Sequence, residues 1–154
     1  MYADPSGHFV IAYSIGKIVA DYIRKKYQPW HYSRIEKGKE YYFPENYNDI
    51  LKGDKLDEYI TNVAANCHQF SAENYGDHIK LMSLDGKYEV IYNKITGEKV
   101  TDPRDIGTYN YYNPNENGLG HFFVDVVPWI FWGNSEEDTT DFIERIRYMI
   151  GIHE

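Results

Sequence analysis

The first part of the chain carries apolar residues at helical spacing. Between residues 9 and 26 the apolar positions that share one helical face are Ile11, Ile15, Ile18, Val19 and Tyr22. Steps of three and four residues are typical of an amphipathic helix. The sequence Gln28-Pro29-Trp30 predicts the end of this helix, because a proline disfavours helical backbone in the residue before it. Residues 31–47 are predicted to be irregular.

The middle of the chain predicts a helix followed by strands and turns. A second helix is predicted over about residues 55–74, closed by Gly76. Residues 78–84 and 87–93 flank Asp85-Gly86, a pair that favours a tight turn between two strands. Thr96-Gly97 offers a second turn into residues 99–101. This part of the sequence therefore predicts a small antiparallel sheet.

The last third begins with a loop over residues 102–120 that is rich in Tyr, Asn, Gly and Pro. A short apolar helix is predicted from about Leu119, broken or restarted at Pro128. Ser135 with Asp138 predicts the start of a final helix, whose apolar face is Phe142, Ile146, Met149 and Ile150. The predicted fold class is α+β, a small antiparallel sheet packed with about four helices.

Composition limits the possible partners. The net charge of −8 means that the average surface repels phosphate backbones and anionic lipid, so nucleic acid would need a local basic patch. Sixteen tyrosines within an aromatic content of 17% suit clefts and interfaces. Cys67 is the one cysteine, which excludes an intrachain disulfide. No run approaches the roughly 20 apolar residues of a membrane span, and residues 1–7 do not resemble a signal peptide.

Residues 1–8, Met-Tyr-Ala-Asp-Pro-Ser-Gly-His, resemble the segment that closes the repeat shell of Rhs/YD-repeat proteins. In that family Asp-Pro-Ser-Gly marks the junction between carrier and toxin, although the same four residues also favour a simple turn. Further stretches that are similar to the tails of other Rhs-type toxins lie at residues 107–111, 120–125, 128–129 and 132–134. The resemblance implies a junction tail over residues 1–8 and a single toxin domain over residues 9–154.

The same resemblance implies which partners the domain has, how it is delivered and where it acts. The expected partners are the Rhs/YD-repeat carrier shell and a cognate immunity protein in the producing cell. The domain would be secreted as part of the larger protein, released by self-cleavage, and act in a neighbouring cell, with the cytoplasm as the expected compartment. Most tails of this class are enzymes, because one delivered molecule must turn over many substrates to kill.

His121 and Asp125 form the leading catalytic candidate. Their spacing of four residues places both on one helical face, where the carboxylate can orient the imidazole as a general base or both can bind one metal ion. Tyr109 and Asn110 are predicted to hold substrate, with Tyr111 and Asn134 nearby. The simpler interpretation is that His121 caps the helix and Asp125 faces solvent. The neighbouring residues are nearly all apolar, however, and a buried ionisable group needs a polar partner.

Cys67 offers an alternative nucleophile. The sequence Asn66-Cys67-His68-Gln69-Phe70 is similar to the nucleophile turn of papain-like cell-wall amidases, in which the start of a helix helps to form the thiolate. His121 would then supply the catalytic histidine. The favoured interpretation is inert packing, because Cys67 falls at helical spacing with the apolar residues around it.

Two charged stretches are weaker candidates. His31 and Arg34, with Lys37 and Lys39, would bind a phosphate, but a solvated basic loop is the commoner explanation. Arg104 and Asp105, in the sequence Asp-Pro-Arg-Asp, would clamp a phosphate or bind a metal, but a surface turn is the preferred interpretation. The sequence contains no phosphate-binding glycine loop, no paired-cysteine zinc spacing and no His-Glu-x-x-His.

The site is therefore predicted between the loop 102–120 and the helix that begins at His121. The favoured chemistry is hydrolysis of a phosphodiester in RNA or DNA, with a divalent metal as a candidate cofactor and the aromatic residues as base-stacking surfaces. The acidic balance of the chain counts against a nuclease. The alternatives are a cysteine peptidase or amidase that uses Cys67 and His121, and a non-enzymatic toxin that binds its target through aromatic residues.

Overall fold

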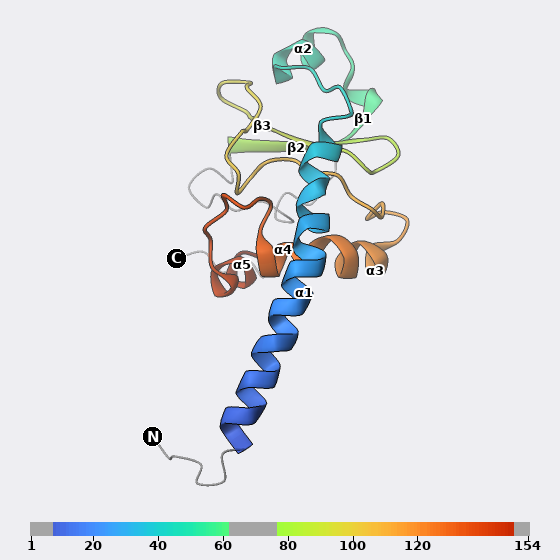
Figure 1. The fold of residues 1–154 in the computed structure, drawn as a ribbon. Helices are drawn as coiled ribbons and strands as arrows, with labels where there is room; N and C mark the ends of the chain where they lie inside the picture. The colour runs from blue at the N-terminus through green and yellow to red at the C-terminus, as the bar shows by residue number, and fades with distance from the viewer. Residues whose placement is uncertain (1–7, 62–76, 150–154) are drawn as a thin grey trace. The chain divides into compact units, whose positions relative to one another are not determined.

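The computed structural model describes the backbone of residues 8–61 and 77–149 (Figure 1). The chain divides into two compact units, residues 1–30 and residues 31–154. The proposed junction over residues 1–7 lies outside the described residues, as does the greater part of the predicted helix over 55–74. The assignment of residues 9–154 to one toxin domain stays a prediction.

Helix α1 spans His8–Gly38 and contains Pro29. The prediction that it ends at residues 28–30 is wrong, and so is the prediction that residues 31–38 are irregular. Proline removes one backbone donor, which weakens a helix locally without stopping it when later turns are held by tertiary contacts. Here the turns after Pro29 are held within the second unit, where His31 and Arg34 are buried and bonded to residues more than 90 positions away.

Two short helical segments follow. Helix α2 spans Tyr47–Lys52, and the side chain of its N-cap Asn46 accepts a hydrogen bond from the Asn48 N–H at 2.9 Å. The 3₁₀ helix η1 spans Leu56–Glu58 and leads into strand β1, Tyr59–Ile60. The predicted start of a long helix at residue 55 is therefore wrong. Pairing of Tyr59 with Ser83 on the sheet takes the place of a second helical turn.

The sheet has the order β1-β2-β3 and is antiparallel. Strand β2 spans His78–Ser83 and strand β3 spans Glu89–Asn93, with Leu81 opposite Val90. The predicted pair of strands across a tight turn is confirmed, and Gly86 adopts the positive φ of 71° that this turn requires. The predicted fold class, helices with a small antiparallel sheet, is also confirmed.

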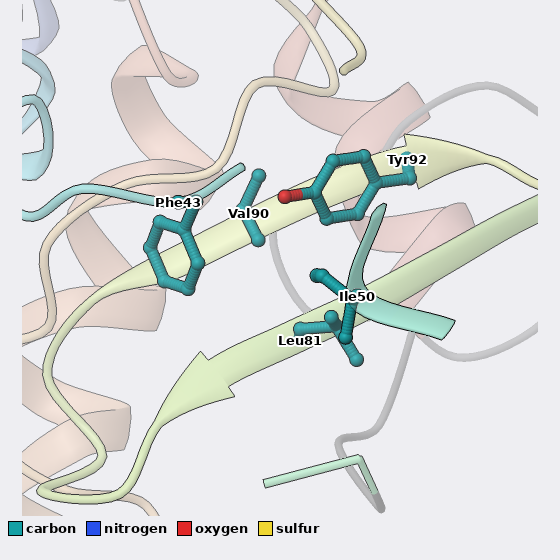
Figure 2. Close-up of a cluster of buried hydrophobic side chains, with 5 residues drawn as sticks. All are labelled: Phe43, Ile50, Leu81, Val90 and Tyr92. Carbon is teal, nitrogen blue, oxygen red and sulfur yellow. The ribbon is translucent and has the colours of Figure 1, made fainter. Parts of the chain in front are cut away.

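One apolar cluster fills the space between α2 and the sheet. Figure 2 shows its five buried side chains, which are Phe43, Ile50, Leu81, Val90 and Tyr92. The Tyr92 hydroxyl donates a hydrogen bond of 2.7 Å to the Pro44 carbonyl, and burial raises the pKa of this phenol. The cluster therefore fastens the segment after α1 and helix α2 to strands β2 and β3.

The C-terminal helices lie on the other side of the sheet from α2 (Figure 1). Helix α3 spans Gly118–His121, a π-helical turn η3 spans Phe122–Val126, and helix α4 spans Val127–Trp132. The helical turns α3, η3 and α4 follow one another without a gap, so the predicted break or restart at Pro128 corresponds only to a change from π-helical to α-helical hydrogen bonding, with Pro128 in the first turn of α4. A second buried cluster is formed by Val126, Trp129 and Ile130, with Ile146 and Met149 packed against it.

The final helix, α5, spans Phe142–Met149. The prediction that it begins at Ser135 is wrong. Asp141 caps it, since its carboxylate accepts a hydrogen bond of 2.9 Å from the Glu144 N–H. Asp138 instead pairs with Arg145 at 3.3 Å, so the carboxylate that was expected to begin the helix holds α5 from the side.

Gly133 ends α4 with φ 72°, ψ −168°, a conformation that is essentially restricted to glycine. A Cβ at this position would collide with the Asp138 carboxylate. We expect Gly133→Ala to lower the free energy of unfolding by about 1–3 kcal/mol, measured by urea denaturation. Gly118→Ala is the matched control, because nothing lies within 4 Å of a Cβ there, and alanine in a helix should be neutral or stabilising. Equal stability of the two variants would show that alanine is not strained at position 133.

Candidate functional site

The interior of the second unit contains charged side chains. Among the described residues, three pairs of a Lys or Arg with an acid are almost fully buried: Arg34 with Asp125 at 3.3 Å, Lys80 with Glu89 at 2.9 Å, and Arg145 with Asp138 at 3.3 Å. Removing two charges from water is costly, so such pairs are stable only where each charge keeps close polar partners. The geometry of each pair therefore has to be specified by the surrounding backbone.

Asp125 has the richest set of contacts. Its Oδ1 accepts hydrogen bonds from Arg34 Nη1 at 3.3 Å and from the Tyr111 N–H at 3.0 Å. Its Oδ2 accepts one from the Tyr112 N–H at 3.2 Å and lies 3.2 Å from His121 Nδ1. The simpler interpretation, in which Asp125 faces solvent, is wrong, because the side chain is fully buried. One carboxylate thus joins α1, the loop before α3, and α3 itself.

Arg34 and His31 form the opposite side of this cluster. Arg34 also donates to the carbonyl oxygens of Asp125 and His31, each at 3.3 Å, and burial lowers the pKa of its guanidinium against the pull of Asp125. His31 Nε2 lies 2.6 Å from the Gly133 carbonyl oxygen, an atom that only accepts, so this nitrogen carries the proton. The interpretation of His31 and Arg34 as part of a solvated loop is wrong, because both residues lie in α1 and are buried.

His121 lies at the edge of the cluster, with its side chain 9% exposed. The structure brings it together with Asp125 as the spacing suggested. Its neighbours include exposed aromatic side chains: Phe122 and Phe123 follow it in the chain, and the Tyr112 ring lies against Gly120. We call Tyr112, Phe122 and Phe123 the aromatic rim. His121 therefore contacts a buried carboxylate and belongs to a segment that also carries exposed rings.

Lys37 is a residue that the sequence reasoning left in a basic loop. Its Nζ lies 4.0 Å from the ring centroid of Tyr109 and 5.4 Å from that of Tyr111, and the two rings meet edge to face at 5.3 Å. The backbone N–H of Tyr111 also donates to Asp125. The ammonium group of Lys37 therefore lies over the ring of a residue that is itself hydrogen-bonded to this carboxylate. Arg34 and Lys37 are three residues apart and are therefore neighbours on the surface of α1. The sequence would have shown this if the helix had been predicted to continue beyond Pro29.

The remaining predicted site residues make contacts elsewhere in the unit. The buried Asn110 amide donates to Glu89 Oε1 at 2.7 Å, and the buried Asn134 amide donates to the Arg104 carbonyl at 2.9 Å. Arg104 pairs with Asp102 at 2.7 Å in an exposed turn, and this hydrogen bond raises the pKa of Arg104. Asp105 is 1% exposed. Binding of substrate by these four residues stays a prediction.

Other candidate features are located as follows. Cys67 and the residues beside it lie outside the described residues. Within residues 8–61 and 77–149, no group of three His, Cys, Asp or Glu side chains converges as metal ligands do. A groove of about 430 Å³ lies between residues 38–45, strand β3 and residues 99–107. None of the groove's lining residues belongs to α3 or η3, so it is distinct from the predicted cleft at His121.

In comparisons with known proteins, no family model matches this chain, and neither a curated protein nor a solved structure does.

Asp125→Asn tests the central ion pair. The amide cannot neutralise Arg34, so a buried charge is left unpaired, and we expect the free energy of unfolding to fall by about 3–5 kcal/mol. Asp102→Asn breaks an exposed pair with Arg104 and should cost less than about 1 kcal/mol. Urea denaturation of both variants measures the difference. Similar small losses would mean that Asp125 does not organise the core.

The titration of His31 gives a second test. Burial, reinforced by the charge of Arg34, lowers the pKa of His31 from 6.5 to about 3. Between these values the unfolded chain binds the proton and the folded chain does not, so the free energy of unfolding falls as the pH falls, by up to about 1.4 kcal/mol per pH unit. Above about pH 6.5 the group contributes no pH dependence.

His31→Gln retains a donor for the Gly133 carbonyl and removes the titration. Stability measured by urea denaturation between about pH 6 and pH 5, a range in which most carboxylates stay ionised, should therefore depend less steeply on pH in the variant. Parallel slopes for the two proteins would show that His31 is not held neutral.

Proposed function

We propose that this chain is the toxin domain of an Rhs-type effector and that it hydrolyses nucleic acid in the target cell. The class is suggested by the Asp-Pro-Ser-Gly sequence at residues 4–7. The chemistry is suggested by one observation, the contact of 3.2 Å between His121 Nδ1 and an Asp125 carboxylate that other groups hold in place. A histidine oriented by a fixed carboxylate is a common form of general base.

The proposed reaction needs one proton acceptor. His121 removes a proton from a water molecule or from a ribose 2′-hydroxyl, and the resulting oxygen attacks phosphorus. A P–O bond forms, the P–O bond to the leaving oxygen breaks, and that oxygen takes up a proton from the imidazolium or from water. Asp125 orients the imidazole and stabilises it in its charged form, so Asp125 acts as a positioning residue. Arg34 in turn pairs with Asp125.

The surroundings of His121 suit an unpaired strand. Exposed aromatic rings are stacking surfaces for bases, and the three exposed rings of the aromatic rim belong to the same helical segment as this histidine or to the loop before it. Lys37 supplies a local positive charge near Tyr109 and Tyr111. This cation addresses the objection that a chain of net charge −8 repels phosphate, because binding depends on the local field as well as the total.

The first test is toxicity and its dependence on His121. Induced expression of the wild-type domain in the bacterial cytoplasm should stop growth, and RNA or DNA extracted from those cells should be degraded. His121→Ala should remove both effects while the melting temperature falls by only a few degrees, because the side chain lies at the edge of the cluster. Glu116→Gln, an exposed change in the preceding loop, is the matched control and should kill like the wild type.

Three outcomes would contradict the proposal. Killing by His121→Ala at the wild-type level would exclude this histidine as the base. Loss of killing in a folded Cys67→Ser protein, with intact nucleic acid and damaged cell wall after export to the periplasm, would favour the cysteine hydrolase. Normal growth in both compartments at good expression would exclude a toxin. Asp125→Asn is unsuitable for this test, because its expected instability would itself remove activity.

A further inference from the structure

The described part of the first unit presents an apolar helical face with exposed side chains. The exposed large apolar side chains of α1 in this unit, each 38–68% exposed, are Ile15, Ile18, Val19, Tyr22, Ile23, Tyr27 and Trp30. At 100° per residue, these seven positions fall within about half of the helix circumference. In its described part the unit is a single helix, so an apolar stripe of this width has to find its partner outside the unit.

The charges of the same segment indicate what kind of partner fits. Residues 14–30 contain four basic side chains, Lys17, Arg24, Lys25 and Lys26, and one acidic side chain, Asp21. Residues 31–154 contain 12 basic and 22 acidic residues, a balance of −10. The strong negative charge of the chain therefore lies entirely outside this helix, which is itself positive.

The aromatic and basic residues of this face are of the kinds that lie at the boundary between water and the hydrocarbon of a bilayer. Lys26 Nζ lies 5.8 Å from the Tyr22 ring centroid and 5.2 Å from that of Tyr27, so a cation accompanies the aromatic rings. Tyrosine and tryptophan prefer the headgroup level of a bilayer, and lysine extends its ammonium group toward anionic headgroups. Aliphatic residues between them would enter the acyl boundary.

We propose that residues 14–30 of α1 bind the surface of a bilayer that contains anionic phospholipid, with the helix lying in the plane of the interface. A bilayer surface supplies both the apolar layer and the negative charge that this segment lacks. A second copy of the chain fits less well, because pairing two such helices would bring their basic residues together. Among the helices of the described residues, none has the length and apolar character of a membrane span.

The experiment uses the full chain and two kinds of vesicle, one of phosphatidylcholine and one of phosphatidylcholine with phosphatidylglycerol. Co-sedimentation at low salt should recover the protein with the anionic vesicles, and added salt should weaken the binding. Ile18→Glu, at the centre of the face, should weaken it by at least about tenfold, since it removes one buried aliphatic side chain and adds a like charge. Ile95→Glu is the matched control, because Ile95 is 75% exposed in a turn of the second unit, and it should leave binding unchanged.

Three results would overturn the proposal. The first is failure of the wild-type chain to bind anionic vesicles. The second is equal binding by wild type and Ile18→Glu. The third is a concentration-dependent dimer, measured by analytical ultracentrifugation without lipid, that Ile18→Glu abolishes, which would assign the face to a second copy. Circular dichroism of Ile18→Glu checks that the helix is retained, since an exposed substitution should not unfold it.

Discussion

The structure of the second unit depends on the neutralisation of one buried carboxylate. Asp125 receives Arg34 from α1, two backbone N–H groups from the loop before α3, and His121 from the preceding turn. An apolar side chain could not replace Asp125, because it would remove the carboxylate that pairs with the buried Arg34 guanidinium. The aromatic residues of the loop are positioned as a consequence, since the backbone at Tyr111 and Tyr112 is fixed by the same two oxygens.

The charged interior also explains where sequence reasoning succeeded and failed. The turn residues Asp85-Gly86 identified strands β2 and β3, and Pro128 identified the start of α4, because these signals act locally. The continuation of α1 beyond Pro29 was missed, because it depends on Arg34 meeting Asp125, 91 positions away in the sequence. The contact of His121 with Asp125 was foreseen from spacing alone, whereas the involvement of Arg34 and Lys37 required the extended helix. Asn110 and Asn134 were expected at substrate, but no local pattern reveals that their amides are bonded inside the protein.

The two units differ in how their charge is arranged. In the second unit acidic residues outnumber basic ones, and several of the basic ones are paired in the interior. In the first unit the basic residues all lie on α1. Net charge alone suggests a chain that avoids every anionic partner. Its distribution instead permits a local attraction, at Lys37 for phosphate and along α1 for lipid, within a protein that is repelled elsewhere.

The π-helical turn η3, Phe122–Val126, has a consequence for sequence change in this protein. A π-helical turn forms i→i+5 hydrogen bonds and so holds about one residue more than an α-helical turn. Here the turn begins directly after His121 and contains Asp125, whose carboxylate lies 3.2 Å from the imidazole. Deleting one residue between the two would change their spacing from four residues to three and favour α-helical i→i+4 hydrogen bonding. The number of residues in this segment is therefore tied to the His121–Asp125 contact, and related chains that keep the contact should also keep the length of the turn.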